Sequence, residues 1–295
     1  MNLSVDLPRL LNEIDTLALH SETPPPAVTR LVFSPEDQQA RAMLADLFTQ
    51  AGLQLRVDAV GNTFARWVGS DPTRPPLATG SHIDAIPNAG KYDGVLGVLG
   101  ALEAIRALQA AGFQPAASID IILFTSEEPT RFGLGCLGSR LLSGRLDPDQ
   151  ADALTDPQGQ TLATLRTQAG FTGPLSSARL TPGHYAAFLE LHIEQGPLLE
   201  RQNVAIGAVE KIAAPAALRV QLQGEGGHAG AVLMPERRDA SLGGAEVALA
   251  VERLVTQLGS PDGVGTTGVF TIRPGAINSV PFHALLEIDL RDTDH

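Results

Sequence analysis

The chain has 295 residues and a mass of 31.0 kDa, which is the length of about two domains and enough to bury a large core. Its net charge of −12 and the absence of any stretch rich in Lys and Arg argue against nucleic-acid binding. A single cysteine excludes an internal disulfide, no apolar run approaches the about 20 residues that span a bilayer, and charged residues between Asp6 and Asp15 interrupt any signal-peptide core. We therefore expect a cytoplasmic protein without a membrane segment.

The first part of the chain alternates between helical and strand patterns. Apolar residues at helical spacing follow Ser34, which is a suitable N-cap, and three glycines three residues apart give a later helix a smooth face for packing on a sheet. Such alternation predicts an α/β domain with a mainly parallel sheet, whose functional residues lie at the carboxyl ends of the strands. The predicted elements are helices over 3–19, 35–52 and 94–110 and strands over 54–58, 63–68, 77–81 and 118–125.

The pattern changes in the second part of the chain. Residues 150–185 are polar and are expected to form small helices and loops before a strand over 187–193. Further on, the order strand, helix, strand, strand is typical of an α+β unit. We therefore place a boundary near Ile212, with one domain over 1–212 and another over 213–295. The predicted elements of the second domain are strands over 218–223, 265–272 and 284–291 and a helix over 238–258.

Four segments at or near predicted strand ends carry side chains that can bind a metal ion. They offer imidazoles and carboxylates without a thiolate, a mixture that suits Zn²⁺, Mn²⁺ or Co²⁺. Each has an ordinary alternative: a loop histidine, a solvated pair of glutamates or a helix N-cap aspartate. Their shared place at the edge of the sheet favours a metal site. The candidates are His82, Asp93, Glu127, Glu128 and His192.

A pair of ions about 3.5–4 Å apart needs a bridging carboxylate. Asp93 is the best bridge, because it lies at the start of a helix whose dipole helps to keep it ionised. Of the two adjacent carboxylates, we expect Glu128 to bind metal and Glu127 to act as the general base that moves a proton from the attacking water to the leaving nitrogen.

These residues lie in motifs that resemble the carbamoylase and allantoate-amidohydrolase branch of the M20 dinuclear metallohydrolases. The motifs are GSHIDAIPNAGKYDGVLGVLG from Gly80, FTSEEPTRFG from Phe124, LHIEQG from Leu191, GEGGHAG from Gly224 and EIDLRDTD from Glu287. The resemblance implies that His82 and His192 hold one ion, Glu128 holds another, Asp93 bridges them and Glu127 is the base. It implies Zn²⁺ or Mn²⁺, with Co²⁺ and Ni²⁺ as alternatives.

The resemblance also implies an architecture. Residues 1–212 correspond to a mainly parallel-sheet catalytic domain, and 213–295 to an inserted α+β lid of the βαββαβ type, here incomplete, through which such proteins form homodimers. The implied substrate contacts are Gln195, His228, Asn278 and Arg291. Arg291 can form a forked pair with a carboxylate, and His228 can donate to a developing oxyanion. Without the resemblance, Arg291 would be interpreted as an ordinary arginine at the end of a strand, and His228 as a loop histidine.

The segments EPTRFG and GAINS look most like those of ureidoglycolate amidohydrolases, with allantoate amidohydrolases and N-carbamoyl-L-amino-acid hydrolases as close alternatives. All three cleave a ureido C–N bond in a small carboxylate and release ammonia, which is the function we expect. Two other functions are kept open: a catalytically inactive relative that only binds metal and self-associates, and an M20 peptidase.

The sequence departs from the family at its C-terminal end. The family continues with the rest of the lid and the closing part of the catalytic domain, which includes a last histidine for the ion held by Glu128. Neither His283 nor His295 is a good substitute. The resemblance therefore implies a chain truncated at the C-terminus, with a weak second metal site and impaired activity.

Overall fold

The computed structural model describes residues 3–294, which form two compact units divided after Pro197. The division comes earlier in the chain than the boundary expected near Ile212. The residues between these positions contain a short helix, α7 (Leu198–Arg201), and the first strand of the second unit begins at Ala214. Below, the first unit is the part up to Pro197 and the second unit is the part from Leu198 onward.

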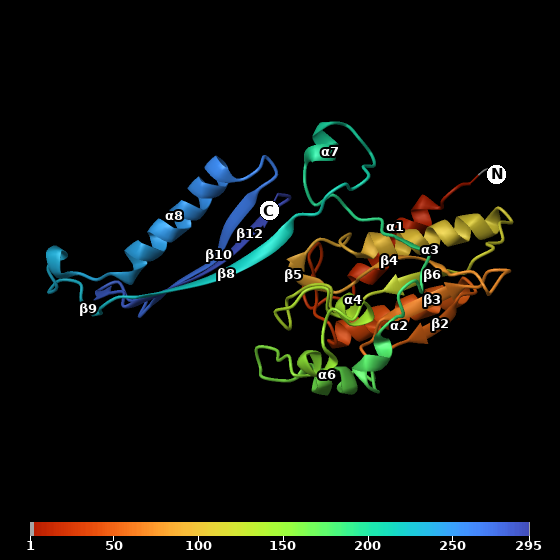
Figure 1. Cartoon of the computed structure of the whole chain (residues 1–295), viewed down its shortest axis with the longest axis horizontal. Coiled ribbons are helices and arrows are strands. Elements are labelled where there is room, and N and C mark those ends of the chain that lie inside the picture. The colour runs from red at the N-terminus through yellow and green to blue at the C-terminus, as the bar shows by residue number, and fades with distance from the viewer. Residues whose placement is uncertain (1–2, 295) are drawn as a thin grey trace. The chain divides into compact units, whose positions relative to one another are not determined.

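The first unit is built on a five-stranded sheet with the strand order β2-β3-β6-β4-β7. Only β3 runs against the other four strands, because β2 and β6 both pair with it in antiparallel fashion while β4 is parallel to β6 and β7. The expected mainly parallel α/β sheet is thereby confirmed (Figure 1). The strands are β2 (Gln54–Val57), β3 (Thr63–Trp67), β4 (Leu77–Ser81), β6 (Ile119–Leu123) and β7 (Ala187–Leu189).

Helices cover both faces of this sheet. One face packs against α1 (Leu7–Ala18), α2 (Pro35–Gln50) and α3 (Val95–Ala110), and the shared core includes Leu44, Leu99 and Ile121. The other face presents Phe64 and Ile122 to α4 (Leu137–Leu142) and the 3-10 helix η1 (Leu175–Ala178). Alternate residues of β3 and β6 therefore face opposite layers, as buried strands require.

Local sequence accounts for several boundaries. Helix α2 begins after Ser34, whose side chain accepts a hydrogen bond from the backbone N–H of Asp37, as expected of an N-cap. Strand β4 contains Gly80 at φ 140°, where an added Cβ would lie 2.0 Å from the Ile122 carbonyl oxygen. Only glycine fits at that position beside β6.

The remaining elements of the first unit are short. A two-stranded antiparallel sheet of β1 and β5 was not predicted, whereas the small helices expected over 150–185 are present. These elements are β1 (Val28–Arg30), β5 (Ala85–Ala89), α5 (Pro148–Asp152) and α6 (Leu162–Gln168).

Arg30 fastens the end of α1 to the segment that follows β4. Its guanidinium is fully buried and donates to the carbonyl oxygens of Leu17, His20 and Ile83 at 2.6, 2.9 and 2.9 Å. Burial lowers the pKa of Arg30 to about 10, so the group remains charged at neutral pH.

Replacement of Arg30 by Met is expected to lower the free energy of unfolding by about 3 kcal/mol, because it removes three buried hydrogen bonds from a charged donor to backbone carbonyls. Urea unfolding followed by circular dichroism measures this loss. Arg74→Met is the control, since Arg74 is exposed and forms only a 4.0 Å surface ion pair, worth less than about 1 kcal/mol. Equal losses in the two variants would contradict the role assigned to Arg30.

The second unit contains the predicted βαββ order. Its three-stranded antiparallel sheet has the order β10-β12-β8, α8 packs on it, and two short strands pair separately (Figure 1). Ala284 and Leu286 of β12 are buried under α8. The elements are β8 (Ala214–Gln223), β9 (Gly227–His228), the 3-10 helix η2 (Met234–Glu236), α8 (Ala240–Leu258), β10 (Val264–Arg273), β11 (Ser279–Val280) and β12 (His283–Asp292). Among the residues described, no helix has the length and apolar character needed to cross a membrane.

Candidate metal centre

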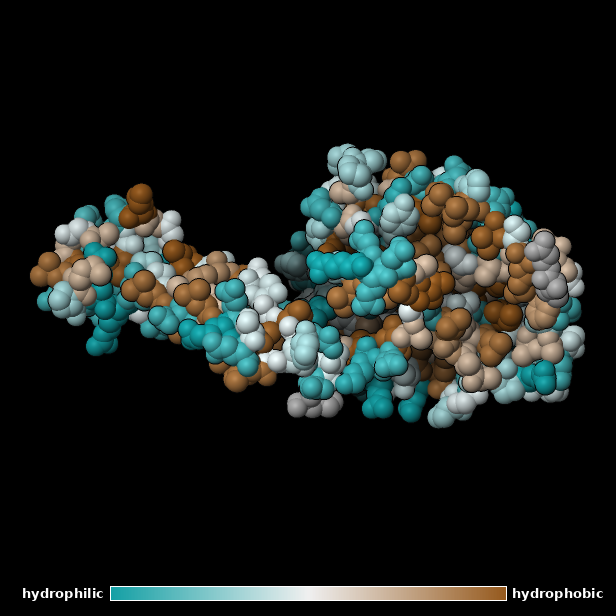
Figure 2. Space-filling model, turned by 90° about the horizontal axis from the view of Figure 1, so that it is seen from above, coloured by the Kyte–Doolittle hydropathy of each residue, from teal (hydrophilic) through white to brown (hydrophobic). Residues whose placement is uncertain are grey.

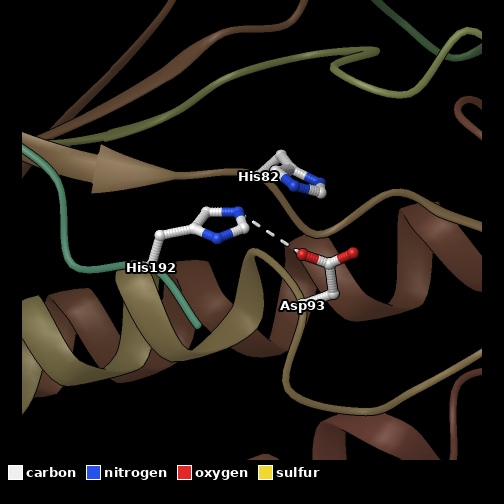
Figure 3. A group of neighbouring side chains, drawn as sticks. All are labelled: His82, Asp93 and His192. Carbon is white, nitrogen blue, oxygen red and sulfur yellow. Dashed lines mark ion pairs between the residues drawn. The ribbon is translucent and has the colours of Figure 1, made fainter. Parts of the chain in front are cut away.

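Three predicted ligands converge in the first unit (Figure 3). His82 directly follows β4, and Asp93 precedes α3. His192 lies in the loop after β7, because this strand ends at Leu189 and does not extend to residue 193 as predicted. One potential ligand atom from each lies within 4.8 Å of the others, and Nε2 of His192 is 3.4 Å from Oδ1 of Asp93. Because β4 and β7 are neighbours in the sheet, their carboxyl ends bring the two imidazoles together.

Both histidines are oriented by backbone carbonyls. Nδ1 of His82 lies 2.9 Å from the carbonyl oxygen of Asp84, and Nδ1 of His192 lies 2.8 Å from that of Ile193. Since a carbonyl only accepts hydrogen bonds, each Nδ1 carries a hydrogen, which leaves the Nε2 atom of each ring as the one that can bind a metal.

One carboxylate oxygen of Asp93 accepts a hydrogen bond and the other does not. Gln195 donates from Nε2 to Oδ2 at 2.7 Å, whereas Oδ1 is buried and has no hydrogen-bond partner among the described residues. The next residue, Gly94, has φ 64°, and an added Cβ would lie 2.6 Å from Nε2 of His82. The backbone therefore passes so close to the imidazole that a side chain would fill the space between the ligands.

This donor set fits a divalent cation. Zn²⁺ holds nitrogen and oxygen ligands at about 2.0–2.2 Å in a tetrahedron, which places neighbouring ligand atoms about 3.4 Å apart. The His192–Asp93 distance already has this value. A buried carboxylate oxygen without a hydrogen bond, close to two oriented imidazoles, is what a metal ion would satisfy.

The Glu127–Glu128 pair lies beside His82 and is held through its backbone. Oδ1 and Oδ2 of the fully buried Asp84 accept the N–H groups of Glu127 and Glu128 at 3.2 and 2.9 Å. Oε2 of Glu127 is 3.7 Å from Nε2 of His82. Glu128 is not one of the three residues whose ligand atoms converge, so its role at a second ion stays a prediction.

Negative charge is concentrated here. Burial and the charge of Glu127 raise the pKa of Glu128 to about 7. Burial acts to lower the pKa of His82, but the charges of Asp84 and Glu127 outweigh it and leave this pKa above its ordinary value. A bound cation would relieve the repulsion among these carboxylates.

The segment that carries His192 lies on the glycine face of α3. An added Cβ at Gly97 would lie 2.7 Å from the Leu191 carbonyl oxygen and 2.7 Å from Cβ of Ser81. The hydroxyl of Ser81 also donates to Oε1 of Glu190 at 2.6 Å, which fastens the same segment to β4.

Gly97→Ala is therefore expected to displace the segment with His192 and weaken Zn²⁺ binding at least about tenfold. Alanine's higher helix propensity would offset part of any loss in stability. Gly100→Ala is the matched control, because its Cβ would meet only flexible side-chain ends, Cδ2 of Leu191 at 3.2 Å and Cδ1 of Leu96 at 4.0 Å. Competition with a chromophoric chelator measures both affinities, and equal affinities would contradict the prediction.

The predicted substrate contacts of the second unit fall in two places. His228 on β9 and Asn278 are adjacent, since the N–H of Ala229 donates to the Asn278 carbonyl at 2.9 Å. Arg291 lies near the far end of β12 and pairs with Asp289 at 2.9 Å. His228 and Asn278 line an open pocket of about 440 Å³ together with Gly226, Gly227, Pro274, Ser279, Val280 and Phe282.

The structure also shows contacts that the sequence did not reveal. Asp84 received no role from the motif, although its position two residues after His82 was an available signal. Cys136 donates to Glu127 across nine positions of chain, and no spacing pattern indicates such a contact. Gln195, expected at the substrate, donates to Asp93 here, and its substrate contact stays a prediction.

Comparison with known proteins places these features in a family. The ureidoglycolate hydrolase of Arabidopsis thaliana is 54% identical to this chain, over 99% of this chain and 63% of the relative. The ureidoglycolate hydrolase of Oryza sativa subsp. japonica is 52% identical, over 98% of this chain and 61% of the relative. The crystal structure of AtUAH in complex with glyoxylate has a TM-score of 0.91 at 54% identity, covering 99% of this chain and 70% of that one. The chain thus spans less than two thirds of the length of these two curated relatives.

The model of the peptidase family M20/M25/M40 matches residues 78–291, a range that includes all the predicted metal ligands and the general base. Members of this family are metal-dependent hydrolases, in agreement with the cluster of two imidazoles and a carboxylate in the first unit. The chain belongs to the M20/M25/M40 family.

Proposed function

We propose that the chain is a metal-dependent amidohydrolase that cleaves the ureido C–N bond of a small carboxylate and releases ammonia. Ureidoglycolate is the first candidate substrate, because the ureidoglycolate hydrolases are more than half identical to this chain over nearly all of it. Allantoate and N-carbamoyl-L-amino acids are the alternatives that the motifs leave open.

The convergence of His82, Asp93 and His192 carries this proposal, because it provides a cation site directly beside the carboxylate of Glu127. His82 and His192 would hold one ion, Asp93 would bridge to another, and Glu128 would bind the second ion. Bound Zn²⁺ or Mn²⁺, or alternatively Co²⁺ or Ni²⁺, supplies Lewis-acid polarisation of the scissile carbonyl and of the attacking water.

The protein's own groups move the proton and hold the substrate. Glu127 takes a proton from the attacking water, the water oxygen bonds to the ureido carbon, and the C–N bond breaks as Glu127 gives the proton to the departing nitrogen. Ammonia leaves, and the carbamate, where formed, breaks down to CO₂. Oε2 of Glu127 faces His82, which supports this role.

The second unit would supply substrate recognition. His228 would donate a hydrogen bond to the oxygen that gains negative charge, and Asn278 beside it would contact the substrate. Arg291 would pair with the substrate carboxylate in place of Asp289, with which it forms an ion pair here. Gln195 would add a contact from the first unit.

We further propose a cytoplasmic homodimer formed through the second unit. Four leucines of α8 are exposed, and the exposed fraction reaches 79% at Leu258. They are Leu242, Leu249, Leu254 and Leu258. Figure 2 shows apolar residues at the surface interspersed with polar ones. Burial of these leucines against a second copy would remove apolar surface from water. Analytical ultracentrifugation tests this association.

Ammonia release from ureidoglycolate, allantoate and N-carbamoyl-L-amino acids, each with Mn²⁺ or Zn²⁺, tests the proposed reaction. Metal-dependent turnover of at least one ureido acid, with two ions bound per chain, would support the proposal. One ion or none, and no ammonia from any of them, would favour a protein that only binds metal. Cleavage of peptides without action on ureido acids would favour a peptidase.

A further inference from the structure

The loop that follows the two glutamates folds back and runs beside them. The N–H groups of Cys136, Leu137 and Gly138 donate to the carbonyls of Glu127, Ser126 and Thr125 at 2.7, 2.9 and 2.9 Å. Gly138 permits this approach, because an added Cβ would lie 2.7 Å from the Thr125 carbonyl oxygen. The backbone of Glu127 is thus fixed by Asp84 on one side and by this loop on the other.

The side chain of Glu127 is also held from the loop. Cys136 has φ 58°, a left-handed conformation uncommon for a residue with a side chain, and its thiol donates to Oε1 of Glu127 at 3.3 Å. Oε2 is left facing Nε2 of His82 at 3.7 Å. The thiol therefore engages one carboxylate oxygen and leaves the other toward the metal ligands.

We propose that Cys136 is a positioning residue for Glu127: its S–H group holds Oε1 so that Oε2 is directed at the metal centre. This inference rests on the proposed role of Glu127 as the general base. Burial and the charge of Glu127 raise the pKa of Cys136 to about 11, so the thiol keeps the hydrogen that it donates at neutral pH.

Alkylation of the thiol tests the contact without any need for activity. Cys136 is the only cysteine in the sequence, so mass spectrometry after iodoacetamide treatment reports on it alone. Glu127→Gln removes the charge that disfavours the thiolate, and we expect alkylation at pH 8 to become about tenfold faster. Glu128→Gln is the matched control and is expected to change the rate less than about twofold.

In urea, where the contact is lost, the alkylation rates of the wild-type chain, Glu127→Gln and Glu128→Gln should be the same. Equal rates there would show that the reagent reacts equally with the three unfolded chains. Equal rates for the folded wild-type chain and Glu127→Gln would overturn the contact, and with it the proposal.

Steady-state kinetics of the metal-loaded chain test the positioning itself. We expect Cys136→Ala to lower kcat about tenfold with KM and metal content unchanged, because a freely rotating carboxylate spends less time in the reactive geometry. Cys136→Ser keeps a donor and should recover most of kcat. An undiminished kcat in Cys136→Ala would overturn the positioning role. If the wild-type chain hydrolyses no ureido acid, the proposed function fails, while the alkylation rates still decide whether the thiol holds Glu127.

Discussion

Glu127→Gln is expected to lower kcat by about 10³-fold while the bound metal stays at its wild-type amount. The amide has nearly the same shape as the carboxylate and can still accept a hydrogen bond from Cys136, but it cannot take a proton from water. Because Glu127 is not among the three converging ligands, its loss should leave metal affinity nearly intact. Ammonia release and metal analysis on the same preparation measure the two quantities.

The control for this variant is Glu22→Gln, which removes an exposed carboxylate outside the cluster and should leave kcat within about twofold. Undiminished hydrolysis by Glu127→Gln would end its assignment as the base. A parallel loss of metal would instead identify Glu127 as a ligand.

Asp93→Asn is expected to weaken metal binding by at least about 100-fold, a larger loss than the about 10–100-fold typical of residues that only support a ligand. The amide has no net charge, so it neither balances a cation nor bridges two of them as a carboxylate does. Isothermal titration with Zn²⁺ or Mn²⁺ measures the affinity.

Gln195→Leu provides a graded comparison, because it leaves the Asp93 carboxylate in place but removes the hydrogen bond to its Oδ2. The metal affinity of Gln195→Leu should fall between those of the wild-type chain and Asp93→Asn. Chelator should lower the Tm of the metal-loaded wild-type chain and leave that of Asp93→Asn unchanged, since binding to the folded state stabilises it. Unaltered affinity in Asp93→Asn would show that the metal, if bound, lies elsewhere.

Local pattern was sufficient for most of the fold. Ser34 marked the start of α2, and strand β4 was predicted with the bounds that it has, ending at Ser81 just before His82. In the second unit, alternation over 284–291 identified β12, whose Ala284 and Leu286 are buried. Periodicity predicts these segments because each has one buried and one exposed face, or a length that is typical of a strand or of a helix.

The features that the sequence did not reveal depend on contacts between distant residues. Strands β1 and β5 are short and pair with each other across more than fifty positions, and neither has a distinctive pattern. In the sequence Cys136 is a single cysteine without a motif, and only the folded loop places its thiol at Glu127. The candidate ligands could be named from residue type and strand ends, but the orphaned Oδ1 of Asp93 and the carbonyls that orient both imidazoles are visible only in three dimensions.

The chain divides after Pro197, so the three converging ligands and Glu127 all belong to the first unit, while His228, Asn278 and Arg291 belong to the second. If the latter recognise substrate as proposed, the metal ligands and the general base lie in one compact unit and most of the substrate contacts lie in the other. Recombination could then replace the second unit with that of a relative. The exchange would alter which acid is bound, while the metal ligands of the first unit stay the same.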